Sequence, residues 1–253
     1  MSSLWWIFAS LVYALCVMTL GWQCRQAQKP FVHGFIWIVF LFVFQSIALL
    51  LKGLEMEACP VRGEANVLFY FSWGLTLFYI ILGRPYRASA LGLFTLPGVC
   101  LLTIASLGLT FTSTETPYAD NLLLTIHVAI AMLGYAALIL SGVLGLIFLA
   151  ENKKLKKHLL PSKEIGLPPI RILHKSMKRL MLASFILIII SEIFGVVAHL
   201  DVPTIKLWIV GILNGAFAVI WFWQIVWGLS GKKWAISSVI LALFSLSIFL
   251  VNK

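Results

Sequence analysis

Charged residues are scarce in this chain, and that scarcity excludes most classes of protein. Only 11% of its 253 residues are Asp, Glu, Lys or Arg, whereas a water-soluble domain carries about 25%. The apolar residues, 61% of the total, come in long runs. Runs of about 20 apolar residues can cross a hydrocarbon layer roughly 30 Å thick. The sequence therefore predicts an integral membrane protein.

The sequence also lacks the common catalytic signatures. It contains no GxSxG, no Walker-type glycine loop, no HExxH and no carboxylate pair at a defined spacing. No catalytic residue can be assigned, and we expect the protein not to be an enzyme. None of its four cysteines (Cys16, Cys24, Cys59 and Cys100) belongs to a CxxC pair, so thiol–disulfide chemistry is not expected either.

The long apolar runs predict an all-α fold. Lipid offers no hydrogen-bond partner to an unpaired backbone group, so each span must be a helix, and the short alternating segments of a membrane barrel are missing. We predict one polytopic membrane domain over residues 1–253. Its eight expected spans are 3–22, 34–51, 66–83, 89–110, 121–150, 177–199, 205–229 and 234–251.

The basic residues predict the orientation. The net charge is +10, and most of the 19 Lys and Arg residues fall in alternate loops, above all in the predicted loop 151–176. Such an excess marks the cytoplasmic side. Both termini are therefore expected outside, on the periplasmic side of a bacterial inner (cytoplasmic) membrane. The charge indicates anionic lipid as a partner and gives no support to nucleic acid.

The basic stretch Lys153–Arg179 has two interpretations. Pro161, Pro168 and Pro169 prevent one continuous helix there. The simpler interpretation is a cytoplasmic tether lying on anionic lipid headgroups. The other is a docking surface for a cytosolic partner protein.

Two histidines stand at membrane depth, where an ionisable side chain is a candidate for function. His127 lies near the outer end of the fifth predicted span, and His199 closes the sixth at the same side. Two imidazoles on facing helices can supply both axial ligands of a haem iron. Gly195, one turn before His199, is expected to leave room for the flat macrocycle. The alternative for His127 is a hydrogen bond to a neighbouring helix, with no cofactor.

Two further residues are candidates for the same site. Glu192 lies seven residues before His199, on the same helix face. It could bond a polar group of the ligand, accept a proton, or be a neutral carboxyl bonded to the backbone. Trp73, inside the third predicted span, could line a cavity for a planar ligand, although packing explains it equally well.

Parts of the sequence resemble a known family. The stretch from His127 through Leu138 to Ser141 and Gly142 is similar to a span of the cytochrome c assembly protein family. So are Glu64–Asn66, Phe71–Thr76 and, with less specificity, Leu173–Arg179 and Gly231–Trp234. The resemblance implies that His127 is an external haem ligand and that haem b is the cofactor.

The sequence departs from the family pattern in two places. The tryptophan-rich segment expected after the sixth span is replaced by the short stretch His199–Trp208, and a second external histidine is absent where Gln224 and Trp227 stand. The nearest branch is therefore the HemX-like one, which implies haem handling in haem-protein assembly or control of haem synthesis. The alternatives are a proton-coupled transporter using Glu192 and a scaffold that recruits a cytosolic enzyme through the basic loop.

Overall fold

The computed structural model describes most of the chain in well-defined helices. The described residues are 10–12, 14–15, 17–19, 32–56, 59–61, 63–86, 89–110, 122–156, 169–198 and 204–250. Almost all of these residues are helical, which confirms the predicted all-α class. His199 and most of the first predicted span, 3–22, lie outside the described residues.

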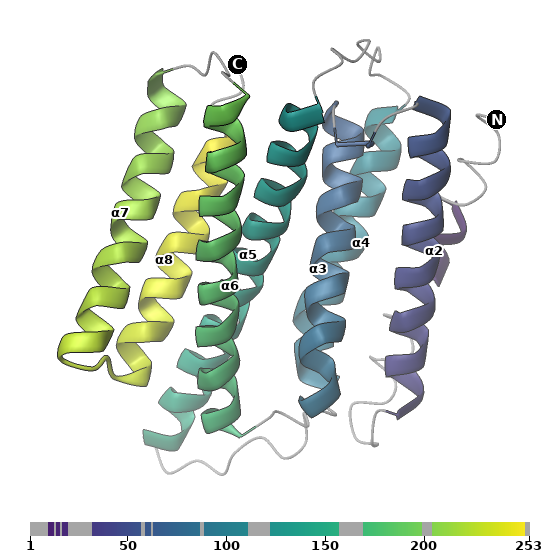
Figure 1. Cartoon of the computed structure of the whole chain (residues 1–253). Coiled ribbons are helices and arrows are strands. Elements are labelled where there is room, and N and C mark those ends of the chain that lie inside the picture. The colour runs from purple at the N-terminus through teal and green to yellow at the C-terminus, as the bar shows by residue number, and fades with distance from the viewer. Residues whose placement is uncertain are drawn as a thin grey trace. The chain divides into compact units, whose positions relative to one another are not determined.

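The helices group into two compact units (Figure 1). The N-terminal unit, 1–125 with 162–168, holds α2 (Val32–Met56), α3 (Glu64–Tyr86) and α4 (Ser89–Thr110). The C-terminal unit, 126–161 with 169–253, holds most of α5 (Leu122–Lys156) and all of α6 (Ile170–Val197), α7 (Thr204–Val226) and α8 (Gly231–Leu250). The single polytopic domain over residues 1–253 stays a prediction.

Five helices among the described residues are long and apolar enough to cross a membrane. They are Phe35–Met56, Glu64–Leu82, Leu122–Lys156, Ile170–Val197 and Leu207–Val226, with shorter apolar helices at Ser10–Thr19 and Thr95–Leu109. The membrane class is therefore supported. The count of eight spans and the direction in which they cross stay predictions.

The predicted cytoplasmic loop 151–176 is wrong in its bounds. The helix α5 continues to Lys156, and α6 begins at Ile170 directly after Pro169. Leu173, Met177 and Leu180 are buried and recur at the three- and four-residue spacing of one helix face. Because this face is buried, α6 begins about two turns before residue 177, where the predicted apolar span begins.

Polar side chains connect the helices of the N-terminal unit. Gln45 Nε2 of α2 donates to Ser72 Oγ of α3 at 3.3 Å, and Trp73 Nε1 donates to Ser46 Oγ at 2.9 Å. Ser106 Oγ of α4 donates to the Ala65 carbonyl of α3 at 2.6 Å. Such bonds across helices compensate for the weak hydrophobic drive between helices in lipid.

Small residues let α5 approach its neighbours closely in the C-terminal unit. A Cβ atom on Gly142 would lie 2.6 Å from Ala242 Cβ of α8, and one on Gly134 would lie 2.8 Å from Ile188 Cγ1 of α6. The helix α5 therefore packs on α6 at one level and on α8 at another. This is the small-residue packing expected of membrane helices.

Candidate functional site

His127 is fixed against α6 by two backbone-directed bonds. Its Nδ1 lies 2.7 Å from the Ser191 carbonyl oxygen, and Ser191 Oγ donates to the His127 carbonyl at 2.8 Å. Ser191 is fully buried, whereas His127 is partly buried. The two residues thus exchange bonds between α5 and α6. The hydrogen bond to a neighbouring helix, which was the alternative for His127, is therefore present, and cofactor ligation by His127 stays a prediction.

These bonds determine which nitrogen of His127 carries the proton. A carbonyl oxygen has no proton to give, so the Nδ1 that faces Ser191 O must be the donor. Ser191 Oγ also lies 3.1 Å from Nδ1, but its single proton is directed to the His127 carbonyl. Among the described residues, Nε2 has no hydrogen-bond partner. An Nδ1–H bonded to a backbone carbonyl is the usual support of a histidine that binds metal through Nε2.

Gly195 makes room for the ring of His127. A Cβ atom at residue 195 would lie 2.8 Å from His127 Nδ1 and 3.0 Å from Cε1, closer than real side chains approach. The expectation that this glycine leaves space for a macrocycle is therefore wrong, because the imidazole itself fills the space. The glycine still serves the site, since it allows the ring to reach the Ser191 carbonyl.

Glu192 is held by a residue that sequence reasoning did not select. Its Oε1 accepts a short hydrogen bond from Asn214 Nδ2 of α7, while Asn214 Oδ1 is buried without a partner among the described residues. The carboxyl also lies near His127 and Tyr135. Glu192 therefore borders the His127 site and joins α6 to α7.

The two remaining predicted site residues are Trp73 and His199. Trp73 belongs to the N-terminal unit, where its ring stacks on Phe42 at a centroid distance of 5.5 Å and lies 5.4 Å from Tyr70. These contacts account for Trp73 as a packing residue. His199 lies outside the described residues, so its role as second ligand stays a prediction.

Ser191, Asn214 and Tyr135 are the site residues that the sequence analysis missed. Asn214 could have been selected from the sequence, because placing a side-chain amide inside an apolar span costs free energy unless the amide is hydrogen-bonded. Ser191 gave a weaker signal, since serine is common where membrane helices pack. No group of three or more His, Cys, Asp or Glu side chains able to hold a metal ion occurs within the described part of the chain.

Comparison of the sequence with known protein families shows the family of this chain. The pattern described as "Cytochrome C assembly protein" matches residues 64–252, from the start of α3 to the end of α8, and so includes every described residue of the site. This chain belongs to the cytochrome c assembly protein family. The membership confirms the coarse resemblance seen in the sequence, while the HemX-like branch is not tested by it.

Several members of this family are similar to part of the chain. Cytochrome c biogenesis protein CcsA from Prochlorococcus marinus (strain AS9601) is 30% identical over 105 residues, which are 38% of this chain and 34% of that protein. The CcsA protein of Trichormus variabilis is 33% identical over 116 residues, 43% of this chain and 33% of that protein. The CcsA protein of Trichodesmium erythraeum is 31% identical over 103 residues, 39% of this chain and 29% of its own length. The chain thus spans about a third of the length of these relatives.

Proposed function

We propose that this chain is a haem-binding protein of cytochrome c assembly, with His127 as an axial ligand of the iron. The observation that carries the proposal is the bond of 2.7 Å between His127 Nδ1 and the Ser191 carbonyl, which leaves Nε2 as the basic nitrogen. Family membership supports a role in cytochrome c assembly. The name of the similar CcsA proteins, cytochrome c biogenesis protein, points the same way.

The residues present fit the chemistry of a haem. The macrocycle itself supplies four nitrogens to the iron, so the protein needs to provide only one or two axial ligands. His127 would hold the iron through Nε2, and His199 is the candidate for the second position. The bound group would supply an iron centre whose potential depends on its axial ligands and on burial. We infer haem b, because no cysteine pair is present to attach haem covalently.

The protein's own contribution is to hold the ligand, and no bond-making step is assigned to it. Ser191 and Gly195 orient the imidazole, which removes the need to reorganise it when iron binds. We propose a HemX-like role in haem handling or in the control of haem synthesis. The alternate basic loops support a bacterial inner membrane, with the His127 site toward the periplasmic side.

Two alternatives have less support. In a proton-coupled transporter Glu192 would have to load and release a proton, but its carboxyl accepts a bond from Asn214, which suits a contact between helices. A scaffold that recruits a cytosolic enzyme would use the stretch Lys153–Arg179, parts of which belong to α5 and α6. Neither alternative explains why His127 is oriented by a backbone carbonyl.

The test is a visible absorption spectrum of the purified protein, expressed with ample haem supply. Wild type is expected to show a Soret band in proportion to protein, and His127→Ala is expected to lose most of it. His174→Ala, which alters a histidine elsewhere on α6, serves as the matched control and is expected to keep the band. A His127→Ala protein that folds and retains the wild-type spectrum would overturn the proposal.

A further inference from the structure

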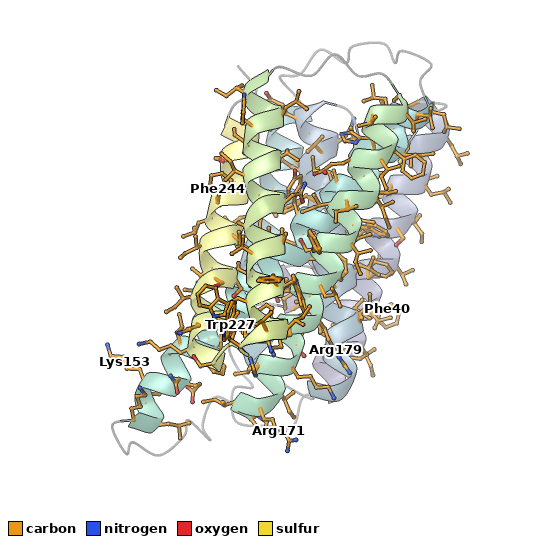
Figure 2. The ribbon with its side chains drawn as sticks, turned by 60° about the vertical axis from the view of Figure 1, so that its left-hand side comes forward. Phe40, Lys153, Arg171, Arg179, Trp227 and Phe244 are labelled. Carbon is orange, nitrogen blue, oxygen red and sulfur yellow. The ribbon has the colours of Figure 1, made fainter. Side chains whose placement is uncertain are left out.

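A second cluster of polar side chains lies at the other end of the C-terminal unit. There α5 and α7 end, and α6 and α8 begin. Figure 2 shows that this end gathers basic and aromatic side chains, among them Lys153, Arg171, Arg179 and Trp227. The His127 site lies near the opposite ends of α5 and α6, so this cluster is separate from it.

The centre of the cluster is a lysine on an indole ring. Lys178 Nζ lies 5.1 Å from the centre of the Trp234 ring, and Trp234 is fully buried. Within the described part of the chain, no carboxylate forms an ion pair with Lys178. The ion pair of Lys154 with Glu151, at 3.0 Å, is on α5. The aromatic face stabilises the ammonium in part and leaves its N–H donors available to an anion.

Two ring nitrogens beside this lysine are buried and have no hydrogen-bond partner among the described residues. One is His174 Nε2, one turn before Lys178 on α6, in a ring that lies 5.9 Å from Phe148. The other is Trp221 Nε1, in a ring that meets Trp234 edge-on at 5.2 Å. An indole N–H can only donate, so it requires an acceptor. Burying such a group unpaired costs free energy, which a bound acceptor would recover.

The surroundings of the cluster suit an anionic ligand. Arg179, Lys232 and Lys233 are exposed around it and add positive charge. At the end of a bundle of membrane helices, exposed basic side chains meet the headgroups of anionic lipids.

We propose that the cluster of His174, Lys178, Trp221 and Trp234 binds the phosphate group of an anionic phospholipid. Lys178 supplies the charge, Trp221 Nε1 supplies a directed donor, and His174 Nε2 adds a third polar contact. The site is independent of the proposed haem function, because it shares no residue with the His127 site.

The test measures lipid retained by the full-length protein. Protein purified in micelles that contain equal amounts of phosphatidylglycerol and phosphatidylcholine is analysed by native mass spectrometry. Wild type is expected to retain phosphatidylglycerol preferentially. Lys178→Met is expected to lower that occupancy about fivefold, the effect of one cation at an anionic lipid surface. Trp221→Phe, which keeps the ring but removes the N–H, is expected to lower it to a smaller extent.

The matched control is Lys175→Met, which removes the same charge from the same helix outside the cluster. Retention within twofold of wild type in this variant, together with rescue by Lys178→Arg, supports a built site. Equal losses in Lys175→Met and Lys178→Met would overturn the proposal in favour of diffuse attraction. Equal retention of phosphatidylcholine would overturn it too. Displacement of the lipid by millimolar inorganic phosphate would assign the site to a soluble phosphate instead.

Discussion

The ring of His127 occupies the space that a side chain at residue 195 would take. A Cβ atom there would lie 2.8 Å from Nδ1 and 3.0 Å from Cε1. The close approach brings Nδ1 within 2.7 Å of the Ser191 carbonyl, one turn earlier on α6. The hydrogen bond therefore depends on the glycine, because a side chain at residue 195 would push the imidazole away from the Ser191 carbonyl.

Gly195→Ala is expected to displace the imidazole and weaken haem retention. Loss of a group that orients a metal ligand typically costs about tenfold or more in affinity, and the same range is expected here. The measurement is Soret absorbance per protein after purification. Gly215→Ala is the control, because a Cβ at Gly215 on α7 meets nothing within 4 Å. Equal haem content in both variants would contradict the role given to Gly195.

Ser191→Ala is expected to lower stability while keeping the haem spectrum. The variant loses the hydroxyl bond to the His127 carbonyl, at 2.8 Å, but keeps the backbone carbonyl that orients Nδ1. A bond between membrane helices contributes about 0.6–1.7 kcal/mol, and the free energy of unfolding is expected to fall by that amount. Unfolding in detergent and a visible spectrum provide the two readouts. If the spectrum changed while stability did not, the backbone carbonyl would not be the orienting group.

Glu192 and Asn214 are expected to be coupled in stability. Either Glu192→Leu or Asn214→Leu alone leaves a polar partner unbonded between α6 and α7, whereas the double variant removes both. A double-mutant cycle is expected to give a coupling of about 0.6–1.7 kcal/mol, and Glu192→Gln is expected to be close to neutral. Additive effects would show that the pair does not hold the helices. A pH-driven uptake signal that Glu192→Gln abolishes would favour the transporter alternative.

Cys59 tests the orientation of the chain. Its side chain is exposed between α2 and α3, in a segment predicted to be external. In a variant with Cys16, Cys24 and Cys100 replaced by alanine, an impermeant maleimide is expected to label Cys59 in intact cells. Desolvation by the surrounding protein raises the pKa of this thiol, so less thiolate forms at neutral pH and labelling is expected to accelerate as pH rises.

The control for orientation is a single cysteine at the basic end of α5. Lys154→Cys, in a background without other cysteines, is expected to be labelled only after the membrane is permeabilised. Labelling of Lys154→Cys but not of Cys59 in intact cells would mean that the charge pattern was interpreted in the wrong direction.

The sequence predicted those site residues whose own side chain is costly to place in a membrane. His127 and Glu192 could be selected as candidate site residues because each is an ionisable side chain inside an apolar run. The motif around His127 indicates the family. These signals are local, because an ionisable group in lipid is costly wherever it lies. The helical class follows for the same reason, since the backbone of every span must bond internally.

The partner of His127 could not be predicted from the sequence. Ser191 acts on Nδ1 through its carbonyl, which every residue has, so its identity carries no signal for the contact. The correct role of Gly195 depends on the rotation of α5 against α6, and that rotation is set by packing such as Gly134 on Ile188. The two early turns of α6 were hidden because their charged residues masked the buried face of Leu173 and Met177.

The most direct test of the account is rescue of His127→Gly with imidazole, followed by the visible spectrum of the haem-supplied protein. The variant removes the ring and leaves a space of matching shape beside Ser191 and Gly195. We predict that its Soret band is lost, and that added imidazole restores a band like that of wild type. A His127→Gly protein that keeps the wild-type band without imidazole would contradict the assignment of His127 as an axial haem ligand.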